Sequence, residues 1–82
     1  MKYEIEIRKR AEKDLSNIPK SDAQKIADAI FILEDGLVGD IKKLTNFSHE
    51  YCLRIGDWRV LFEVSKTKIT IFRILHRKEV YR

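Results

Sequence analysis

The chain has 82 residues and a formal net charge of +4, and 44% of it is apolar, which is typical of a globular protein. This length allows one domain, residues 1–82, because domains usually need about 50 to 200 residues. The longest apolar run, residues 29–33, is too short to span a membrane, and one cysteine excludes an internal disulfide. The first residues also lack the apolar core of a signal peptide. We therefore expect a cytoplasmic protein that has no membrane partner.

The basic charge is concentrated in the second half of the chain. Residues 1–41 carry 7 basic and 9 acidic side chains, a net charge of −2, whereas residues 42–82 carry 10 and 4, a net charge of +6. One interpretation is a solvated surface that keeps the protein soluble. The concentration into one half favours a polyanionic partner such as nucleic acid.

The first half predicts a strand followed by two helices. Residues 2–7 alternate apolar and charged side chains, which is the pattern of a half-buried strand. The apolar spacing then becomes helical, and Pro19 ends this first helix because it disfavours helical geometry in the residue before it. Ser21 or Asp22 caps a second helix, which stops at Gly36. We expect the two helices to form a hairpin that covers one face of a sheet.

The second half predicts three strands, over residues 51–55, 58–64 and 68–76. Gly56 and Asp57 separate the first two strands and suit a type II′ hairpin turn. Between the helices and these strands, residues 41–44 form either a turn or a short extended segment. The order β-α-α-β-β-β is an α+β fold, in which the N-terminal strand and the helical hairpin pack on one face of a small antiparallel-rich sheet.

The two-residue turn also fixes the pairing of the strands beside it. If Ile55 pairs with Trp58, Arg54 lies directly opposite Arg59, and both arginines point away from the helices. Facing cations destabilise a sheet unless water or an anion separates them. Guanidinium groups match the geometry of phosphate and stay charged. The two arginines are therefore a candidate phosphate clamp, and two solvated surface side chains are the alternative.

The last seven residues combine basic side chains with an aromatic ring, namely His76, Arg77, Lys78, Tyr81 and Arg82. This combination suits single-stranded nucleic acid, because the charges bind the backbone and the ring stacks on a base. The alternative is a frayed, soluble terminus.

With these motifs in this order, the chain resembles the RelE branch of the RelE/ParE superfamily, toxins of type II toxin–antitoxin systems. The matching segments are a strand, a helical hairpin with LSNIPK at its corner, Lys43-Leu44, the hairpin YCLRIGDWRVLFEV and the ending ILHRKEVYR. These segments span essentially the whole chain, so the resemblance implies a single RelE-like toxin domain.

The resemblance implies a ribosome-dependent endonuclease that cuts messenger RNA in the ribosomal A site and so inhibits translation. A ribose 2′-hydroxyl attacks the neighbouring phosphate, with no metal and no other cofactor. The implied roles are proton abstraction or phosphate contact for Arg54, transition-state stabilisation for Arg59, and contact with the leaving group or phosphate for Arg77. Tyr81 is implied to orient or stack the substrate. We expect further RNA contacts from Lys42, Lys43, Lys78 and Arg82.

The resemblance also implies three partners, which are the ribosome, its messenger RNA and a cognate RelB-like antitoxin. We expect this antitoxin to have an acidic, partly disordered segment that folds around the basic face of the toxin. Such a segment neutralises the arginines and covers the active surface at the same time.

Two positions depart from the family pattern. Cys52 occupies a strand position that is often lysine, and we expect it to act as a small, partly buried apolar side chain. Arg54 stays protonated and is a poor proton acceptor, so His76 is the best alternative acceptor, unless it merely ends its strand. His49 and His76 are isolated in the sequence, so we expect no metal site.

Two other functions stay open at this point. A ParE-like toxin inhibits DNA gyrase by binding, although that branch generally lacks the basic and tyrosine ending of residues 76–82. A catalytically weak member retains mainly the binding of an antitoxin, and this alternative is favoured by Cys52 and by the absence of lysine from residues 51–58.

Overall fold

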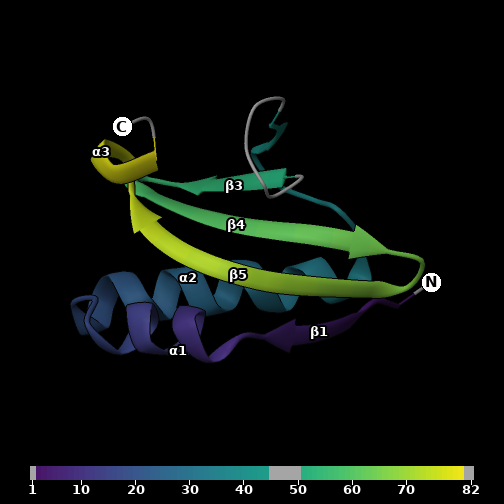
Figure 1. Cartoon of the computed structure of the whole chain (residues 1–82), viewed down its shortest axis with the longest axis horizontal. Helices are drawn as coiled ribbons and strands as arrows, with labels where there is room; N and C mark the ends of the chain where they lie inside the picture. The colour runs from purple at the N-terminus through teal and green to yellow at the C-terminus, as the bar shows by residue number, and fades with distance from the viewer. Residues whose placement is uncertain (1, 45–50, 81–82) are drawn as a thin grey trace.

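The computed structural model describes residues 2–44 and 51–80, which have the predicted α+β fold (Figure 1). The elements are β1 (Glu4–Ile7), α1 (Lys9–Ser16), α2 (Lys20–Ile32), the 3-10 turn η1 (Leu33–Asp35), β2 (Ile41–Lys43), β3 (Tyr51–Ile55), β4 (Trp58–Ser65), β5 (Lys68–His76) and α3 (Arg77–Val80). His49, Tyr81 and Arg82 lie outside the described residues, so the predictions made for them stay predictions.

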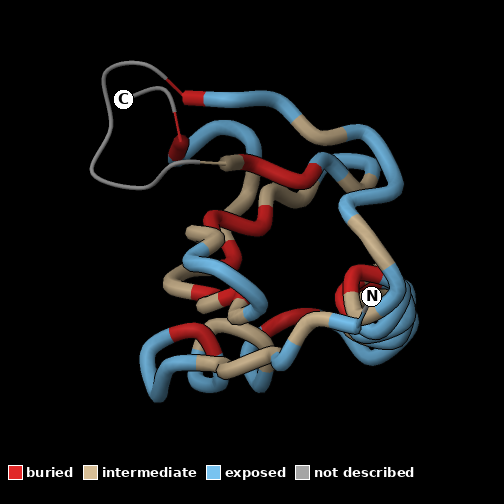
Figure 2. Tube along the Cα trace, turned by 90° about the vertical axis from the view of Figure 1, so that its right-hand side faces the viewer, coloured by how far each residue is buried: buried red, intermediate tan, exposed pale blue. Residues whose placement is uncertain are grey.

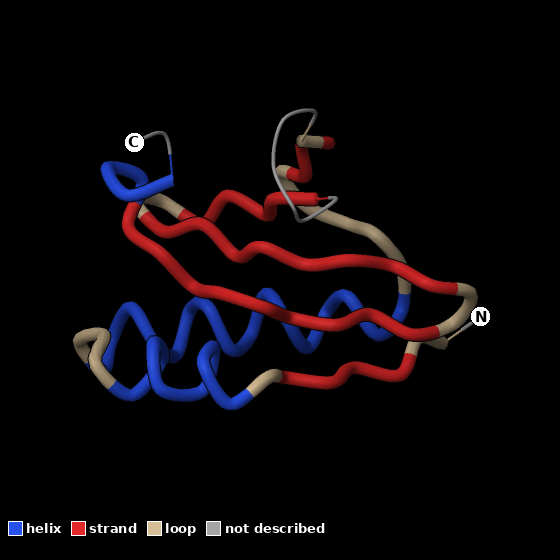
Figure 3. Tube along the Cα trace, in the orientation of Figure 1, coloured by secondary structure: helices blue, strands red, loops and turns tan. Residues whose placement is uncertain are grey.

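The described strands form a five-stranded sheet in the order β1-β5-β4-β3-β2 (Figure 3). β1 runs parallel to β5, and the other neighbouring strands are antiparallel. Of the two alternatives for residues 41–44, the short extended segment is confirmed, because Ile41 to Lys43 pair with β3 as strand β2. The sheet therefore has β1 at one edge and β2 at the other. The prediction that the N-terminal strand packs on one face of the sheet was wrong, because β1 hydrogen-bonds to β5 as a strand of the sheet itself.

Pro19 and Gly36 mark the boundaries of the helical hairpin. α1 ends at Ser16, and α2 begins directly after Pro19, which is its N-cap residue. The prediction that Ser21 or Asp22 caps this helix was wrong, because the restricted φ of proline already starts the helix at residue 20. Helical structure continues through η1 and stops at Gly36, where φ is +151°, as predicted.

α1 and α2 pack on one face of the sheet and enclose the main core. The fully buried side chains of this core come from both layers and include Ile26, Leu33, Val60, Phe62, Ile69 and Ile71. Figure 2 shows buried positions in both the helices and the strands. The side chains of β3 and β4 on the face opposite the arginines all belong to this core or pack against it, namely Leu53, Ile55, Trp58, Val60, Phe62 and Val64. The inner face of the β3–β4 hairpin is therefore fixed by packing in the main core, while its outer face carries Arg54 and Arg59.

A smaller apolar cluster, the outer cluster, lies on the opposite face of the sheet. It consists of Leu44, Cys52, Leu61 and Val80, with Leu75 packed against it. Val80 belongs to α3, so residues 77–80 form a helical turn that docks on this face. The interpretation of the ending as a frayed terminus therefore does not hold for these residues.

α1 covers the part of the β5 edge that β1 leaves open. β1 pairs with β5 only as far as Ile71. Beyond that point the Asp14 carboxylate accepts hydrogen bonds from the Ile74 amide at 3.0 Å and from the Arg73 guanidinium at 2.7 and 3.1 Å. Unpaired amides on a sheet edge favour association with other chains. Asp14 instead satisfies one of these amides from within the molecule.

The β3–β4 turn depends on glycine at position 56. Gly56 has φ +58°. Asp57 has a negative φ, because among the described non-glycine residues only Lys66 has a positive one. A positive φ at the first turn residue followed by a negative φ at the second matches type II′, as predicted. A Cβ at Gly56 would meet no atom within 4 Å, so substitution is costly only through the backbone conformation. We expect Gly56→Ala to lower the free energy of unfolding by about 1 to 2 kcal/mol and Gly56→Asn to lower it less. Urea unfolding measures both, and a Gly56→Ala protein as stable as wild type would contradict this prediction.

Candidate active site

The β3–β4 hairpin brings Arg54 and Arg59 together as predicted. Ile55 pairs with Trp58, so Arg54 lies directly opposite Arg59. Cross-strand partners point to the same side of a sheet. These two residues, called the arginine pair below, therefore project from the outer face, next to Cys52 of the outer cluster.

The guanidinium of Arg59 is held by the backbone of the hairpin turn. Its Nη1 donates to the carbonyl oxygens of Gly56 at 2.7 Å and of Trp58 at 2.9 Å. Its Nε is buried and has no hydrogen-bond partner in the described protein. Within residues 2–44 and 51–80, no carboxylate oxygen lies within 4.0 Å of this guanidinium. Carbonyl dipoles thus fix the group in place, and no carboxylate of the described residues neutralises its positive charge.

Arg54 and Arg77 each form an exposed ion pair. Arg54 Nη2 lies 2.9 Å from Asp40 Oδ1, and Arg77 Nε lies 3.5 Å from Asp57 Oδ1. The four side chains are 44% to 63% exposed, so water screens both pairs and each stabilises the fold only weakly. A phosphate group can therefore replace either carboxylate at low cost. Asp57 lies in the hairpin turn, so its pair with Arg77 brings this third arginine to the end of the sheet that carries Arg59.

α3, which carries two of the C-terminal basic residues, docks on the same face as the arginine pair. Val80 anchors this helical turn in the outer cluster. Arg77 and Lys78 are exposed on it, as their predicted contact with a nucleic acid requires. Tyr81 and Arg82 follow in the sequence but lie outside the described residues.

The structure separates the two lysines of β2. Lys42 pairs with Cys52 and therefore points to the outer face, like the arginine pair. Lys43 pairs with Tyr51, whose ring stacks on that of Phe62 in the main core, so Lys43 points to the opposite side. Lys42 thus places an ammonium group across from the strand position where the family resemblance predicts lysine. This substitute could not be recognised from the sequence, because the pairing of the short β2 has no tight turn to fix it.

Cys52 is a buried side chain of the outer cluster, with 1% of its surface exposed. Burial raises the pKa of the Cys52 thiol, although Arg59 and Arg54 oppose this by favouring the thiolate. The thiol is therefore neutral near pH 7 and packs as a small apolar group, as expected from the sequence.

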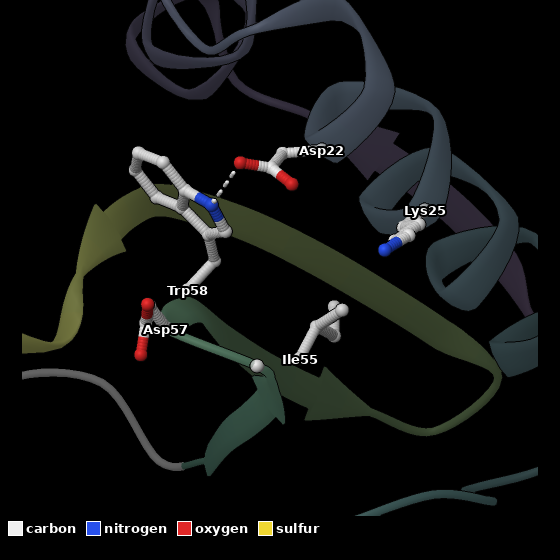
Figure 4. Close-up of a pocket in the computed structure, with 6 residues that line it drawn as sticks. Asp22, Lys25, Ile55, Asp57 and Trp58 are labelled. Atoms are coloured by element: carbon white, nitrogen blue, oxygen red, sulfur yellow. Dashed lines mark hydrogen bonds between the residues drawn. The ribbon is translucent and has the colours of Figure 1, made fainter.

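His76 lies on the opposite face from the arginine pair. The pairing of β4 with β5 contains a bulge between Leu61 and Phe62, and past this bulge His76 pairs with Trp58. Their ring centroids are 5.3 Å apart. Trp58 faces the helices, where its Nε1 donates to Asp22 at 3.2 Å (Figure 4). The structure therefore does not bring His76 to the place where a proton acceptor for the arginine pair would stand.

A cavity of about 300 Å³ lies behind the hairpin turn and is lined by Asp22, Lys25, Ile55, Gly56, Asp57 and Trp58. Figure 4 shows how the five of these that it labels lie around it. It mixes carboxylates with an ammonium group, so it attracts an anion less than the arginine pair does. In the described part of the chain, no three His, Cys, Asp or Glu side chains are grouped so that they could hold a metal ion. No helix in that part is long and apolar enough to cross a membrane.

Comparison with known proteins identifies the family. A family model described as the ParE toxin of the type II toxin–antitoxin system parDE matches residues 5–81. The RelE1 protein of Methanocaldococcus jannaschii is 36% identical over 84 aligned positions, which cover 96% of this chain and 93% of RelE1. The chain belongs to the RelE/ParE superfamily of toxins. Toxin RelE3 of the same archaeon is 40% identical over 42 positions, about half of this toxin.

Solved structures of RelE proteins share the fold of this RelE-family toxin. The RelB–RelE antitoxin–toxin complex from Methanococcus jannaschii matches with a TM-score of 0.76 and 30% identity, covering 92% of this chain and 93% of that chain. The archaeal RelE–RelB complex from Pyrococcus horikoshii OT3 matches with a TM-score of 0.80 and 28% identity, covering 98% and 100%. The predicted family and the predicted RelE-like fold are thereby confirmed.

Proposed function

We propose that this RelE-family toxin is an endonuclease that acts in the cytoplasm and cuts messenger RNA in the A site of the ribosome. The observation that supports it most is Arg59, a guanidinium fixed by two backbone carbonyls and without a carboxylate partner among the described residues. Arg54 and Lys42 lie on the same face. A phosphate that enters this face finds fixed positive charge on a rigid hairpin, which is how electrostatic stabilisation of a transition state is achieved.

The proposed reaction needs no bond to the protein. The 2′-hydroxyl loses its proton to water as its oxygen bonds to the adjacent phosphorus, the bond from phosphorus to the next 5′-oxygen breaks, and that oxygen takes up a proton from water, so that a cyclic phosphate and a 5′-hydroxyl result. Arg59 stabilises the charge that grows on the phosphoryl oxygens, Arg77 acts at the leaving oxygen, and Tyr81 stacks on a base. Arg54 stays protonated, so its proposed role is phosphate contact and not proton abstraction.

Inhibition of DNA gyrase is the second candidate function, because the matching family model is described for a ParE toxin. The two functions separate in one pair of assays. Purified toxin is added to a translation mixture and the message is probed for cuts, while a parallel sample receives gyrase and relaxed plasmid. We expect cut message and normal supercoiling. Intact message together with blocked supercoiling would reverse the ranking.

We propose a RelB-like antitoxin with an acidic segment as the partner that covers this face. The neighbouring RelE structures are complexes with RelB proteins, and the arginine pair gives an acidic chain a target. We expect the dissociation constant to rise about tenfold or more between low and high salt, because exposed charge pairs are screened. Isothermal titration calorimetry at several salt concentrations measures this dissociation constant. We expect the dissociation constant of the Arg54→Ala variant to depend less on salt, because one positive charge has been removed. A salt-independent dissociation constant would indicate a mainly apolar contact.

A further inference from the structure

His76 occupies the junction between β5 and α3, and its ring is held in place from one side. It is the last residue of β5, and the next residue begins α3. The imidazole and the Trp58 indole form a T-shaped pair with an interplanar angle of 84°. The indole is in turn fixed by its hydrogen bond to Asp22 on α2. His76 is thus tied through one neighbour to the helical layer.

The other side of the same ring caps α3. The first amides of a helix have no partner within the helix and need an acceptor from outside. For α3, the Arg77 amide donates to the Asp57 carbonyl at 2.7 Å, and the Lys78 amide donates to His76 Nδ1 at 3.2 Å. A histidine can accept at Nδ1 only as the neutral tautomer with its proton on Nε2. His76 therefore has the role that serine, aspartate or asparagine usually fills at a helix start.

We propose that His76 is a positioning residue that sets α3, and with it Arg77, against the hairpin that carries Arg59. The bulge in the β4–β5 pairing turns His76 away from the arginine pair, so it acts through the backbone of α3 and not on the RNA. The effect of this role on cleavage rests on the proposed function. The cap itself can be measured without any RNA.

Three variants separate a cap from a proton acceptor. Asparagine places its Oδ1 where His76 Nδ1 lies but cannot take up a proton at ordinary pH, glutamine places its oxygen one atom further, and phenylalanine keeps a ring against Trp58 without an acceptor. We expect His76→Asn to cleave within about threefold of wild type, and His76→Gln and His76→Phe to lose about tenfold or more, since misplaced groups lose rate steeply. An asparagine variant as slow as the phenylalanine variant would overturn the proposal and favour proton transfer.

Hydrogen exchange of the Lys78 backbone amide tests the cap without any cleavage assay. We expect the Lys78 amide to exchange roughly fivefold faster in His76→Phe and His76→Gln than in wild type, and at nearly the wild-type rate in His76→Asn. Amides at the centre of β4 serve as the control for folding. Equal exchange of Lys78 in wild type and His76→Phe would overturn the cap. If the wild-type toxin cuts no message, the proposed function fails, and the exchange result still decides whether His76 sets α3.

Discussion

Arg59→Ala is expected to slow cleavage of ribosome-bound message by about 10²- to 10³-fold, the loss seen when one fixed charge-stabilising donor is removed from an active site. The reason is the position of Arg59. Its guanidinium is oriented by two backbone carbonyls and forms no ion pair with a carboxylate of the described residues. The guanidinium is therefore already oriented before an anion binds. Single-turnover cleavage with excess toxin measures the rate without interference from product release.

Matched variants show whether the effect belongs to the site. Arg59→Lys keeps the positive charge but loses the planar guanidinium, which can donate two parallel hydrogen bonds to a phosphate. We therefore expect its cleavage rate to lie between those of wild type and Arg59→Ala. Lys9→Ala removes one positive charge from the exposed start of α1 and is expected to cleave like wild type. Because Arg59 faces Arg54 across the strands, Arg59→Ala should change the free energy of unfolding by less than about 1 kcal/mol. A fully active Arg59→Ala protein would contradict the assigned role.

Asp14→Ala is expected to lower the free energy of unfolding by about 3 kcal/mol, the largest effect on stability from a polar side chain that we predict. The carboxylate accepts two hydrogen bonds from Arg73 and one from the Ile74 amide. Its removal leaves a half-buried guanidinium and an edge amide without an acceptor. Asp14→Asn keeps one acceptor oxygen and is expected to cost less. Urea unfolding at pH 7 measures both.

The same carboxylate makes this stability depend on pH. Burial by itself raises the pKa of Asp14, but the hydrogen bonds from Arg73 and Ile74, together with the positive charges of Arg73 and Arg10, outweigh it, so the folded pKa lies below the ordinary value. A depressed carboxylate pKa stabilises the fold above the unfolded pKa, and that contribution is lost as pH falls through the folded pKa. We expect the difference in stability between wild type and Asp14→Ala to be full at pH 7 and to shrink below about pH 4. A difference that grows on acidification would contradict this assignment.

The arginine pair could be predicted because a two-residue turn leaves one register for the strands beside it. The position of His76 could not, because the bulge between Leu61 and Phe62 lies in the interior of a long strand pair. Without that extra residue, the pairing of Ser65 with Lys68 continues in step, and His76 reaches the same side as Arg59. The sequence has no turn residue at this point to announce the bulge.

Contacts between distant segments were also beyond prediction. Asp14 and Arg73 are 59 residues apart, and both read as ordinary surface charges on an amphipathic helix and a strand. Their pairing follows from the packing of α1 along β5, which local periodicity does not determine. The sequence predicts an RNA contact for Lys42, but only the pairing of β2 with β3 places it opposite Cys52.

Primer extension on ribosomes stalled with one defined codon in the A site tests the central claim most directly. The wild-type toxin is predicted to produce a new end within that codon, bearing a 5′-hydroxyl downstream of the cut, and Arg59→Ala is predicted to produce about a hundredth as much in the same time. The same message without ribosomes is predicted to stay intact. Uncut message at saturating wild-type toxin, or equal cutting of ribosome-free RNA, would contradict the account.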